Sequence, residues 1–178
     1  MARDQTLPDK WLISDKRNDR ALAKALRRLP RGSGFIYRHY HLDDPVRFAR
    51  FMELRRIARA CGHCVVLADS ALTAREWGAD GIYGGPRALY PRRRGLIQLA
   101  TAHDLQEIAI ANRRGADAIL LSPVFPTRSH PGAPVLGPAK FRLLVRHAQM
   151  PVIALGGMSV EGAKALRWPR WAAIDGLS

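Results

Sequence analysis

The stretch from Gly115 to Gly157 constrains the fold most, because it contains two short apolar runs that each change abruptly into a loop. The first run, Ala118–Leu121, is followed by Ser-Pro, and the second, Val152–Leu155, is followed by two glycines. Neither run alternates apolar with polar residues, and such strands are typical of parallel sheets that are buried on both faces. These sheets bind their ligands in the loops at the carboxyl ends of the strands.

Apolar runs of this kind alternate with helical patterns along the whole chain. Strict alternation of strands and helices favours an α/β fold, a minimal (β/α)8 TIM barrel, over an open doubly wound sheet. No full helix is expected after the fourth strand or after the eighth. The expected strands are 11–14, 34–38, 64–68, 81–83, 96–100, 118–121, 152–155 and 172–174, and the expected helices are 19–29, 45–60, 73–77, 102–114, 138–148 and 160–166.

Two matching segments support a repeated strand–helix unit. Gly-Ala-Asp followed by an apolar strand occurs at Gly78 and again 37 residues later at Gly115, about the length of a βαβ unit. We expect each glycine to end a helix in the left-handed conformation, so a Gly78→Ala change would only trim a helix end. Thr101 and Thr73 are expected helix N-caps, because an acidic residue lies three positions after each.

Length and composition indicate one globular domain that spans residues 1–178. The hydrophobic fraction of 47% argues against disorder, and a chain of 178 residues can bury one sizeable core. No apolar run approaches the roughly 18 residues of a membrane span, and the first ten residues lack the apolar segment of a secretory signal. We therefore expect a cytoplasmic protein without membrane contact.

The formal charge of +14 raises the question of a polyanionic partner. Arginine supplies 24 of the 29 basic residues, and its clusters at 27–28, 55–56, 92–94 and 113–114 lie on separate segments. No basic strand with interleaved aromatic residues and no recognisable DNA-reading helix accompanies them. The pattern favours a solvated basic surface and leaves nucleic-acid binding as a third interpretation, behind the two given below.

The two cysteines form Cys61-Gly62-His63-Cys64, which has the spacing of a thioredoxin-type redox motif. In those enzymes the first cysteine opens a helix, where the helix dipole lowers its pKa. Here the motif follows the expected helix 45–60 and runs into a strand. Cys61 would then lie at a helix C-terminus, where the dipole disfavours a thiolate, with Gly62 as the left-handed stop. We interpret the motif as a helix-to-strand turn.

The segment GADAILLSPVFPT at 115–127, followed by a Gly/Pro loop and PVIALGGMS at 151–159, resembles the carboxyl half of thiamine phosphate synthases and of the related thiazole tautomerases. Fainter similarity at 11–15, 66–69 and 78–83 extends the resemblance over nearly the whole chain. It implies a (β/α)8 barrel that joins a pyrimidine-methyl diphosphate to a thiazole phosphate and releases pyrophosphate, with Mg²⁺ as cofactor.

The positions that hold the acceptor phosphate in this family match well. Gly156 and Gly157 precede an expected helix start, so their backbone N–H groups can approach an anion with no Cβ in the way, although they could also merely turn a strand into a helix. Thr127 offers a hydroxyl, and Gly176 follows the last strand. His130 either donates to the phosphate when protonated or is a surface histidine without a chemical role. Barrels commonly bind phosphate beside strands seven and eight.

The positions that hold the diphosphate match less well. Family synthases carry Gln-x-Arg-x-Lys on the second strand, where this chain has Ile36-Tyr37-Arg38-His39-Tyr40, so only Arg38 remains to hold the leaving group by charge. Their Asn-Asp pair after the third strand becomes Ala68-Asp69, and their second metal carboxylate, after the fourth strand, is missing. The resemblance thus implies catalytic roles for Arg38 and Asp69, with Asp69 as the Mg²⁺ ligand.

These departures leave two functional interpretations. The first is a divergent transferase, a synthase of thiamine biosynthesis that couples two phosphorylated heterocycles. The second is a catalytically impaired or re-purposed barrel that binds a small phosphate ligand. Tautomerase activity is disfavoured, since Pro123 replaces the acid–base histidine that precedes Val-Phe in tautomerases. A small phosphorylated heterocycle is the expected partner in both cases, and assembly into a homo-oligomer stays open.

Overall fold

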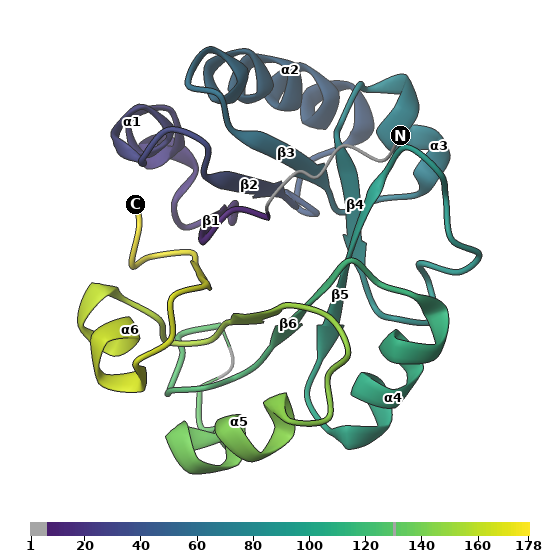
Figure 1. Cartoon of the computed structure of the whole chain (residues 1–178). Coiled ribbons are helices and arrows are strands. Elements are labelled where there is room, and N and C mark those ends of the chain that lie inside the picture. The colour runs from purple at the N-terminus through teal and green to yellow at the C-terminus, as the bar shows by residue number, and fades with distance from the viewer. Residues whose placement is uncertain (1–6, 130) are drawn as a thin grey trace.

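The computed structural model of the chain describes residues 7–129 and 131–178. Within them, eight parallel strands form a closed barrel in which each strand pairs with the next and the last pairs with the first; Figure 1 shows the strands enclosed by helices. The predicted (β/α)8 barrel is confirmed. The strands are β1 Lys10–Ile13, β2 Gly34–Tyr37, β3 Cys64–Leu67, β4 Gly81–Gly84, β5 Ile97–Ala102, β6 Ala118–Leu121, β7 Val152–Ala154 and β8 Trp171–Ala173.

Helices cover the outside of the barrel. In the described part of the chain no helix separates β4 from β5 and none follows β8. Among the same residues, no helix combines the length and the apolar character that crossing a membrane requires. The helices are α1 Leu22–Arg28, preceded by the 3-10 turn η1 Asp19–Ala21, then α2 Asp44–Ala60, α3 Ala71–Glu76, α4 Leu105–Arg114, α5 Gly137–Val145 and α6 Val160–Leu166.

Two of the predicted helix caps are wrong. Thr101 lies inside β5, and α4 is capped by Asp104, whose side chain accepts a hydrogen bond from the backbone N–H of Glu107. Thr73 lies inside α3, which is capped in the same way by Ser70. An N-cap must be the extended residue directly before the helix. Because β5 runs two residues further than predicted and α3 begins two residues earlier, the caps fall on other residues.

The two Gly-Ala-Asp segments have the same structural role, as predicted. Gly78 and Gly115 follow α3 and α4 with left-handed φ angles of +68° and +67°. The aspartates two residues later, Asp80 and Asp117, each accept a hydrogen bond of 2.8 Å from a backbone N–H near the start of the neighbouring strand, in β3 and in β5 respectively. The sequence repeat therefore corresponds to a repeated hydrogen bond that joins the start of one strand to the preceding strand.

The cysteine motif forms the expected turn between α2 and β3. Cys61 directly follows the last residue of α2, Gly62 has a φ of +73°, and Cys64 is the first residue of β3. Within the described chain neither cysteine forms a disulfide. Burial raises the pKa of the Cys64 thiol to about 12, and the charge of nearby Asp80 acts in the same direction. At neutral pH Cys64 is thus a thiol, which is unsuited to nucleophilic redox chemistry.

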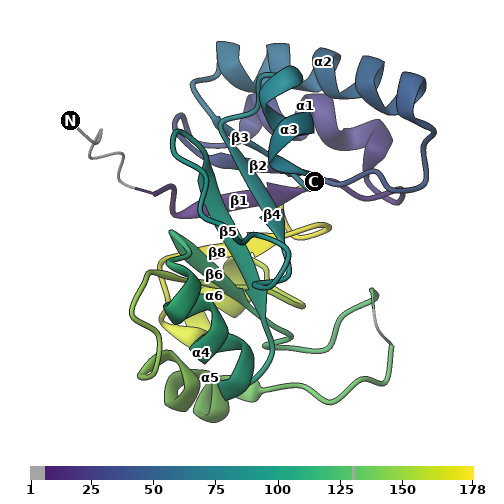
Figure 2. The ribbon, with the colours of Figure 1, turned by 90° about the vertical axis from the view of Figure 1, so that its right-hand side faces the viewer.

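Packed side chains fill the inside of the barrel. The largest is Trp11, which is fully buried and lies against Gly34 on the adjacent strand. A filled barrel leaves only its ends for ligands, and catalytic sites lie at the carboxyl ends of the strands. In side view, the long connection after β6 projects from the end of the barrel at which the C-terminus lies (Figure 2). The inner cluster is Trp11, Ile13, Ile36, Val66, Ala68, Tyr83, Leu99, Ala118, Leu120, Ile153 and Ala172.

Candidate functional site

Arg38 is fixed at the carboxyl end of β2 by residues that follow β1. Its guanidinium donates from Nη2 to Asp15 Oδ2 at 3.1 Å and from Nε to the carbonyl oxygen of Ser14 at 3.2 Å. Its backbone N–H donates to Ser14 Oγ at 2.7 Å. Burial raises the pKa of Asp15, but the hydrogen bonds and charges of Arg17 and Arg38 outweigh it and leave that pKa below its ordinary value. The arginine predicted to hold the diphosphate is therefore at the barrel mouth and already paired with a carboxylate.

A buried histidine, His39, is hydrogen-bonded at the same end of β2. His39 has a φ of +40°, its Nδ1 lies 2.9 Å from Ser14 Oγ, and its Nε2 lies 2.7 Å from Asp19 Oδ1. Because Ser14 Oγ accepts the N–H of Arg38, its own proton is free to donate to Nδ1, and Nε2–H then donates to Asp19. The order of groups is that of a catalytic triad. Ser14 is fully buried, however, so the network positions Arg38 and presents no nucleophile.

A decrease in pH is expected to destabilise the native state, because His39 is buried in its neutral form. Burial lowers the pKa of His39, although its hydrogen bond to Asp19 acts in the opposite direction. The unfolded chain therefore takes up a proton at pH values where native His39 stays neutral, and stability falls as the pH decreases below about 6.5. Urea unfolding from about pH 7.5 to 5.5 should show a flatter pH profile for H39Q than for the wild type. H147Q alters an exposed histidine and is the control. If it flattened the pH profile of stability as much as H39Q does, this assignment would be contradicted.

The carboxyl end of β3 presents Asp69 to a buried arginine. Arg47, in the first turn of α2, donates from Nη1 to Asp69 Oδ2 at 2.5 Å, and the Ser70 backbone N–H donates to Asp69 Oδ1 at 2.7 Å. Burial raises the pKa of Asp69, but these hydrogen bonds, together with the Thr73 side chain and the charge of Arg47, outweigh it and keep that pKa below its ordinary value. Arg47 also donates to the carbonyl oxygens of Ala68 and Arg38 at 3.1 and 3.0 Å. Sequence reasoning missed Arg47, which joins the ends of β2 and β3.

The residues around Asp69 do not fit a divalent metal ion. Mg²⁺ takes oxygen ligands in near-ideal octahedral geometry, yet both oxygens of Asp69 already accept hydrogen bonds, one of them from a guanidinium cation. The end of β4 and the loop that follows it, residues 84–88, contain no acidic residue. Across residues 7–129 and 131–178, no three His, Cys, Asp or Glu side chains are grouped as a metal site would need. The geometry gives no support to the predicted role of Asp69 as a metal ligand.

The loops after β6, β7 and β8 pack on one another through glycines. A Cβ at Gly157 would lie 2.3 Å from the carbonyl oxygen of Pro126 in the β6 loop, and one at Gly156 would lie 2.6 Å from the backbone of the same loop. A Cβ at Gly176, after β8, would lie 2.3 Å from the carbonyl oxygen of Met158 in the β7 loop. The three glycines predicted for the phosphate site therefore bring three loops together, which is a structural requirement that sequence reasoning did not identify.

The same loops offer hydrogen-bond donors at the barrel mouth. Among the described residues, the backbone N–H groups of Gly157 and Gly176 donate to no protein acceptor. Thr127 follows Pro126 directly, and its Oγ1 accepts the Ser129 N–H at 3.2 Å, which leaves the threonine proton free to donate. The structure thus brings Thr127, Gly156, Gly157 and Gly176 into neighbouring loops. His130 lies outside the described residues.

Arg17, which sequence reasoning also missed, connects the two halves of the site. It lies in the loop after β1 and donates from Nε to Asp15 Oδ1 at 3.0 Å and from Nη2 to Ser129 Oγ at 3.0 Å. The same Nη2 lies 3.8 Å from Asp175 Oδ2 in the loop after β8. Asp15 is therefore shared by Arg17 and Arg38. The one available signal in the sequence was the position of Arg17 in the loop that follows a strand, where barrels place site residues.

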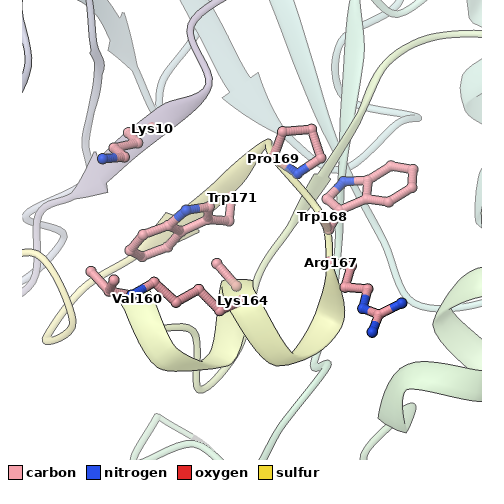
Figure 3. A pocket seen from close by; sticks show the side chains of 8 residues that line it. Lys10, Val160, Lys164, Arg167, Trp168, Pro169 and Trp171 are labelled. Atoms are coloured by element: carbon pink, nitrogen blue, oxygen red, sulfur yellow. The ribbon is translucent and has the colours of Figure 1, made fainter.

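A pocket of about 430 Å³ lies away from this site. Figure 3 shows the ring of Trp171 beside helix α6. Lys10 and Trp171 are the first residues of β1 and β8, so the pocket belongs to the end of the barrel at which the strands begin. It takes no part in the strand-end site. Its lining residues are Lys10, Val160, Ala163, Lys164, Arg167, Trp168, Pro169 and Trp171.

Relatives in sequence share one description. Residues 11–175 match a family model described as thiamine monophosphate synthase. A thiamine-phosphate synthase from Chloroflexus aurantiacus is 32% identical over 149 residues, which cover 80% of this chain and 67% of that protein. A thiamine-phosphate synthase from Pyrococcus horikoshii is 27% identical over 178 residues, which cover 94% of this chain and 83% of that protein.

Solved structures agree on the fold. A thiamine phosphate pyrophosphorylase from Pyrococcus furiosus superposes with a TM-score of 0.78 at 23% identity, covering 96% of this chain and 87% of that one. A citrate synthase superposes with a TM-score of 0.63 at 12% identity, covering 95% and 86%. At these identities the likeness concerns the fold alone, and the second case shows that the same fold carries other chemistry.

Proposed function

Because this chain belongs to the thiamine monophosphate synthase family, we propose that it is a transferase of thiamine biosynthesis. It joins a hydroxymethylpyrimidine diphosphate to a thiazole phosphate and releases pyrophosphate. The observation that carries this proposal is the meeting of three glycine loops and Thr127 at the barrel mouth, beside strands seven and eight, where barrels bind phosphate. The family match over residues 11–175 supports the substrate class.

In this proposal the loops after β6, β7 and β8 hold the thiazole phosphate. The N–H groups of Gly157 and Gly176, which have no acceptor within the described chain, donate to phosphate oxygens. The Thr127 hydroxyl adds a further donor, since its oxygen already accepts from Ser129. Gly156 allows the close approach of the β6 loop that places Thr127 there. His130 is proposed as an additional phosphate contact.

The diphosphate half depends on Arg38. Negative charge grows on the pyrophosphate as it leaves, and a guanidinium held in place for that charge lowers the barrier without reorganising. The contacts of Arg38 with Ser14 and Asp15 supply this fixed position. Asp69 contributes through its ion pair with Arg47, which holds the ends of β2 and β3 together. No step is assigned to Mg²⁺, because the residues present do not fit it at Asp69.

A second candidate is a barrel that binds a small phosphate ligand without this turnover. The pairing of Asp69 with Arg47 and the lack of an acidic residue at 84–88 favour it. Several of the polar or charged groups that bind the diphosphate in this family are absent from this chain. One such contact typically supplies about 3–4 kcal/mol of transition-state stabilisation, so several losses together can abolish turnover even when they are not additive.

Calorimetry and melting shifts distinguish the two candidates. Thiazole phosphate, hydroxymethylpyrimidine diphosphate and pyrophosphate are each titrated with and without Mg²⁺, and a bound ligand raises stability by RT ln(1 + [L]/Kd). A synthase binds both heterocycles and forms thiamine phosphate at a rate that falls in R38A. A re-purposed barrel binds thiazole phosphate and forms no product. Binding of neither heterocycle overturns both candidates.

The Thr127 hydroxyl is expected to contribute directly to binding of the acceptor phosphate. T127V should weaken thiazole phosphate binding by about 1–3 kcal/mol, which is roughly 5- to 150-fold, because one charge-assisted hydrogen bond is lost. T127S keeps the hydroxyl and is the matched control, with an affinity close to that of the wild type. Isothermal titration of the three proteins measures the effect, and equal affinities in all three would remove Thr127 from the site.

A further inference from the structure

Arg47 places a fixed positive charge on the one carboxylate that the family resemblance assigns to Mg²⁺. Its side chain is 7% exposed and reaches the strand ends from the first turn of α2. Its three acceptors are the carbonyl oxygens of Arg38 and Ala68 and the carboxylate of Asp69. All three lie directly after β2 or β3, so the guanidinium sits at the barrel mouth and not on the outer surface.

Aromatic rings and a backbone contact hold Arg47 in this position. Its Cζ lies 5.9, 5.8 and 5.4 Å from the ring centroids of Tyr37, Tyr40 and Trp77, within the range of cation–π attraction. The Tyr37 hydroxyl donates to the carbonyl oxygen of Arg47 at 2.9 Å. The hydrogen bond from Tyr37 fixes the backbone of Arg47, and the guanidinium would have to leave the three rings and the two carbonyl oxygens in order to free the carboxylate.

A metal ion on Asp69 would have to share the carboxylate with this guanidinium. Asp69 Oδ2 lies 2.5 Å from Arg47 Nη1, and Oδ1 accepts the Ser70 N–H at 2.7 Å. Two cations bound to one carboxylate repel each other, and this repulsion is strong where burial lowers the local dielectric constant. A single carboxylate that already neutralises a guanidinium has little charge left to attract Mg²⁺ out of water.

We infer that Arg47 replaces the divalent cation at this edge of the barrel. The ends of β2 and β3 then recognise a diphosphate, or another small phosphate anion, through arginine charge without Mg²⁺. Arg38 contacts the anion, and Arg47 is a positioning residue that neutralises Asp69 and holds the Arg38 backbone by its carbonyl oxygen. The identity of the anion rests on the proposed function, whereas the exclusion of a metal from Asp69 rests only on the contacts of Arg47.

Mn²⁺ binding, followed by electron paramagnetic resonance on the full chain without phosphate, tests the exclusion of a metal. We expect the wild type and D69N to bind Mn²⁺ equally weakly, folded R47M to gain binding, and R47M/D69N to lose that gain. R56M, which removes an exposed arginine from the same helix, is the matched control and should behave as the wild type. R47K keeps the charge and should bind no more Mn²⁺ than the wild type does.

Two results of this experiment would overturn the inference. One is a loss of Mn²⁺ binding on going from the wild type to D69N, because Asp69 would then be a metal ligand despite Arg47. The other is a folded R47M that gains no Mn²⁺ binding, because Arg47 would then not be the group that excludes the metal. The first comparison needs no change at Arg47, so it decides whether Asp69 binds a metal even if R47M fails to fold, and R47K then tests the role of Arg47 with its charge kept.

Titration with inorganic pyrophosphate tests metal-free recognition of the anion. We expect the wild-type Kd in EDTA and in Mg²⁺ to agree within about threefold, and R38A to bind at least tenfold more weakly in both. The inference would be overturned if the wild type bound pyrophosphate at least tenfold more tightly in Mg²⁺ than in EDTA and D69N showed no such difference. If the wild type binds no pyrophosphate under either condition, metal-free recognition fails together with the diphosphate half of the proposed function. The Mn²⁺ comparison then still decides whether Arg47 excludes the metal.

Discussion

Gly157→Val is expected to abolish detectable thiazole phosphate binding and to lower the melting temperature strongly. Gly157 has a φ of +61°, a conformation that is strained for a β-branched residue. A Cβ there would lie 2.3 Å from the carbonyl oxygen of Pro126 and 2.8 Å from Phe125 Cβ. Backbone strain and overpacking each cost about 1–3 kcal/mol. The β6 and β7 loops must therefore separate, and the proposed phosphate donors separate with them.

Differential scanning calorimetry and isothermal titration measure the two effects. A chain of this size loses roughly 2–4 °C of melting temperature per kcal/mol, so we expect a decrease of about 5–20 °C. Gly85→Ala is the matched control, because Gly85 also lies at a strand end, has no atom within 4 Å of its Cβ position and does not adopt a positive φ. Unchanged thiazole phosphate affinity in folded G157V would show that the phosphate binds elsewhere.

Gly78→Ala, which the sequence suggests is a mild change, is not a suitable control. Gly78 does end a helix, but its φ is +68° and a Cβ would lie 2.7 Å from Arg55 Nη2. The helix-ending role was readable from the Gly-Ala-Asp pattern. The contact with an arginine of the preceding helix was not, because it depends on how α2 and α3 lie together in the folded chain.

The barrel itself could be predicted because its strands carry a strong local signal. A strand enclosed between the barrel interior and a helix layer is apolar on both faces, and Ala118–Leu121 are all fully buried. The repeated aspartates, Asp80 and Asp117, each bind the backbone of the preceding strand, so the unit that repeats in the sequence also repeats in space. The helix caps could not be predicted in this way, because the residue that caps a helix depends on where the preceding strand ends and the helix begins.

The ion pairs of the site could not be predicted in the same way. Arg47 lies 22 residues before Asp69, and Arg17 lies 112 residues before Ser129. No periodicity links such positions, since the partner of a charged side chain is set by the tertiary structure. In the sequence, Arg47 resembles the exposed Arg56 of the same helix. The family resemblance pointed to Asp69 correctly as a residue at a strand end, but it could not show that an arginine already occupies its carboxylate.

Trp11→Ala is expected to lower the free energy of unfolding by about 3–5 kcal/mol, a large part of the roughly 5–15 kcal/mol that stabilises a typical domain. Trp11 is fully buried inside the barrel, and its Nε1 donates to the carbonyl oxygen of Pro8 at 2.8 Å. It pairs directly with Gly34 on β2, where a Cβ would lie 2.1 Å from the indole ring. The glycine leaves the volume that the tryptophan fills.

A double-mutant cycle with Gly34 tests this complementarity. Gly34→Ala alone is expected to destabilise by about 1–3 kcal/mol through overpacking, whereas in the W11A background the added methyl group enters the vacated space and costs less. Urea unfolding of the four proteins measures the coupling, and additive effects would show that the two residues do not share one volume. Trp11 lies two residues before the end of β1, deeper in the barrel than Arg38. Folded W11A should therefore bind thiazole phosphate within about threefold of the wild type, which separates the residues that maintain the barrel from those that serve its mouth.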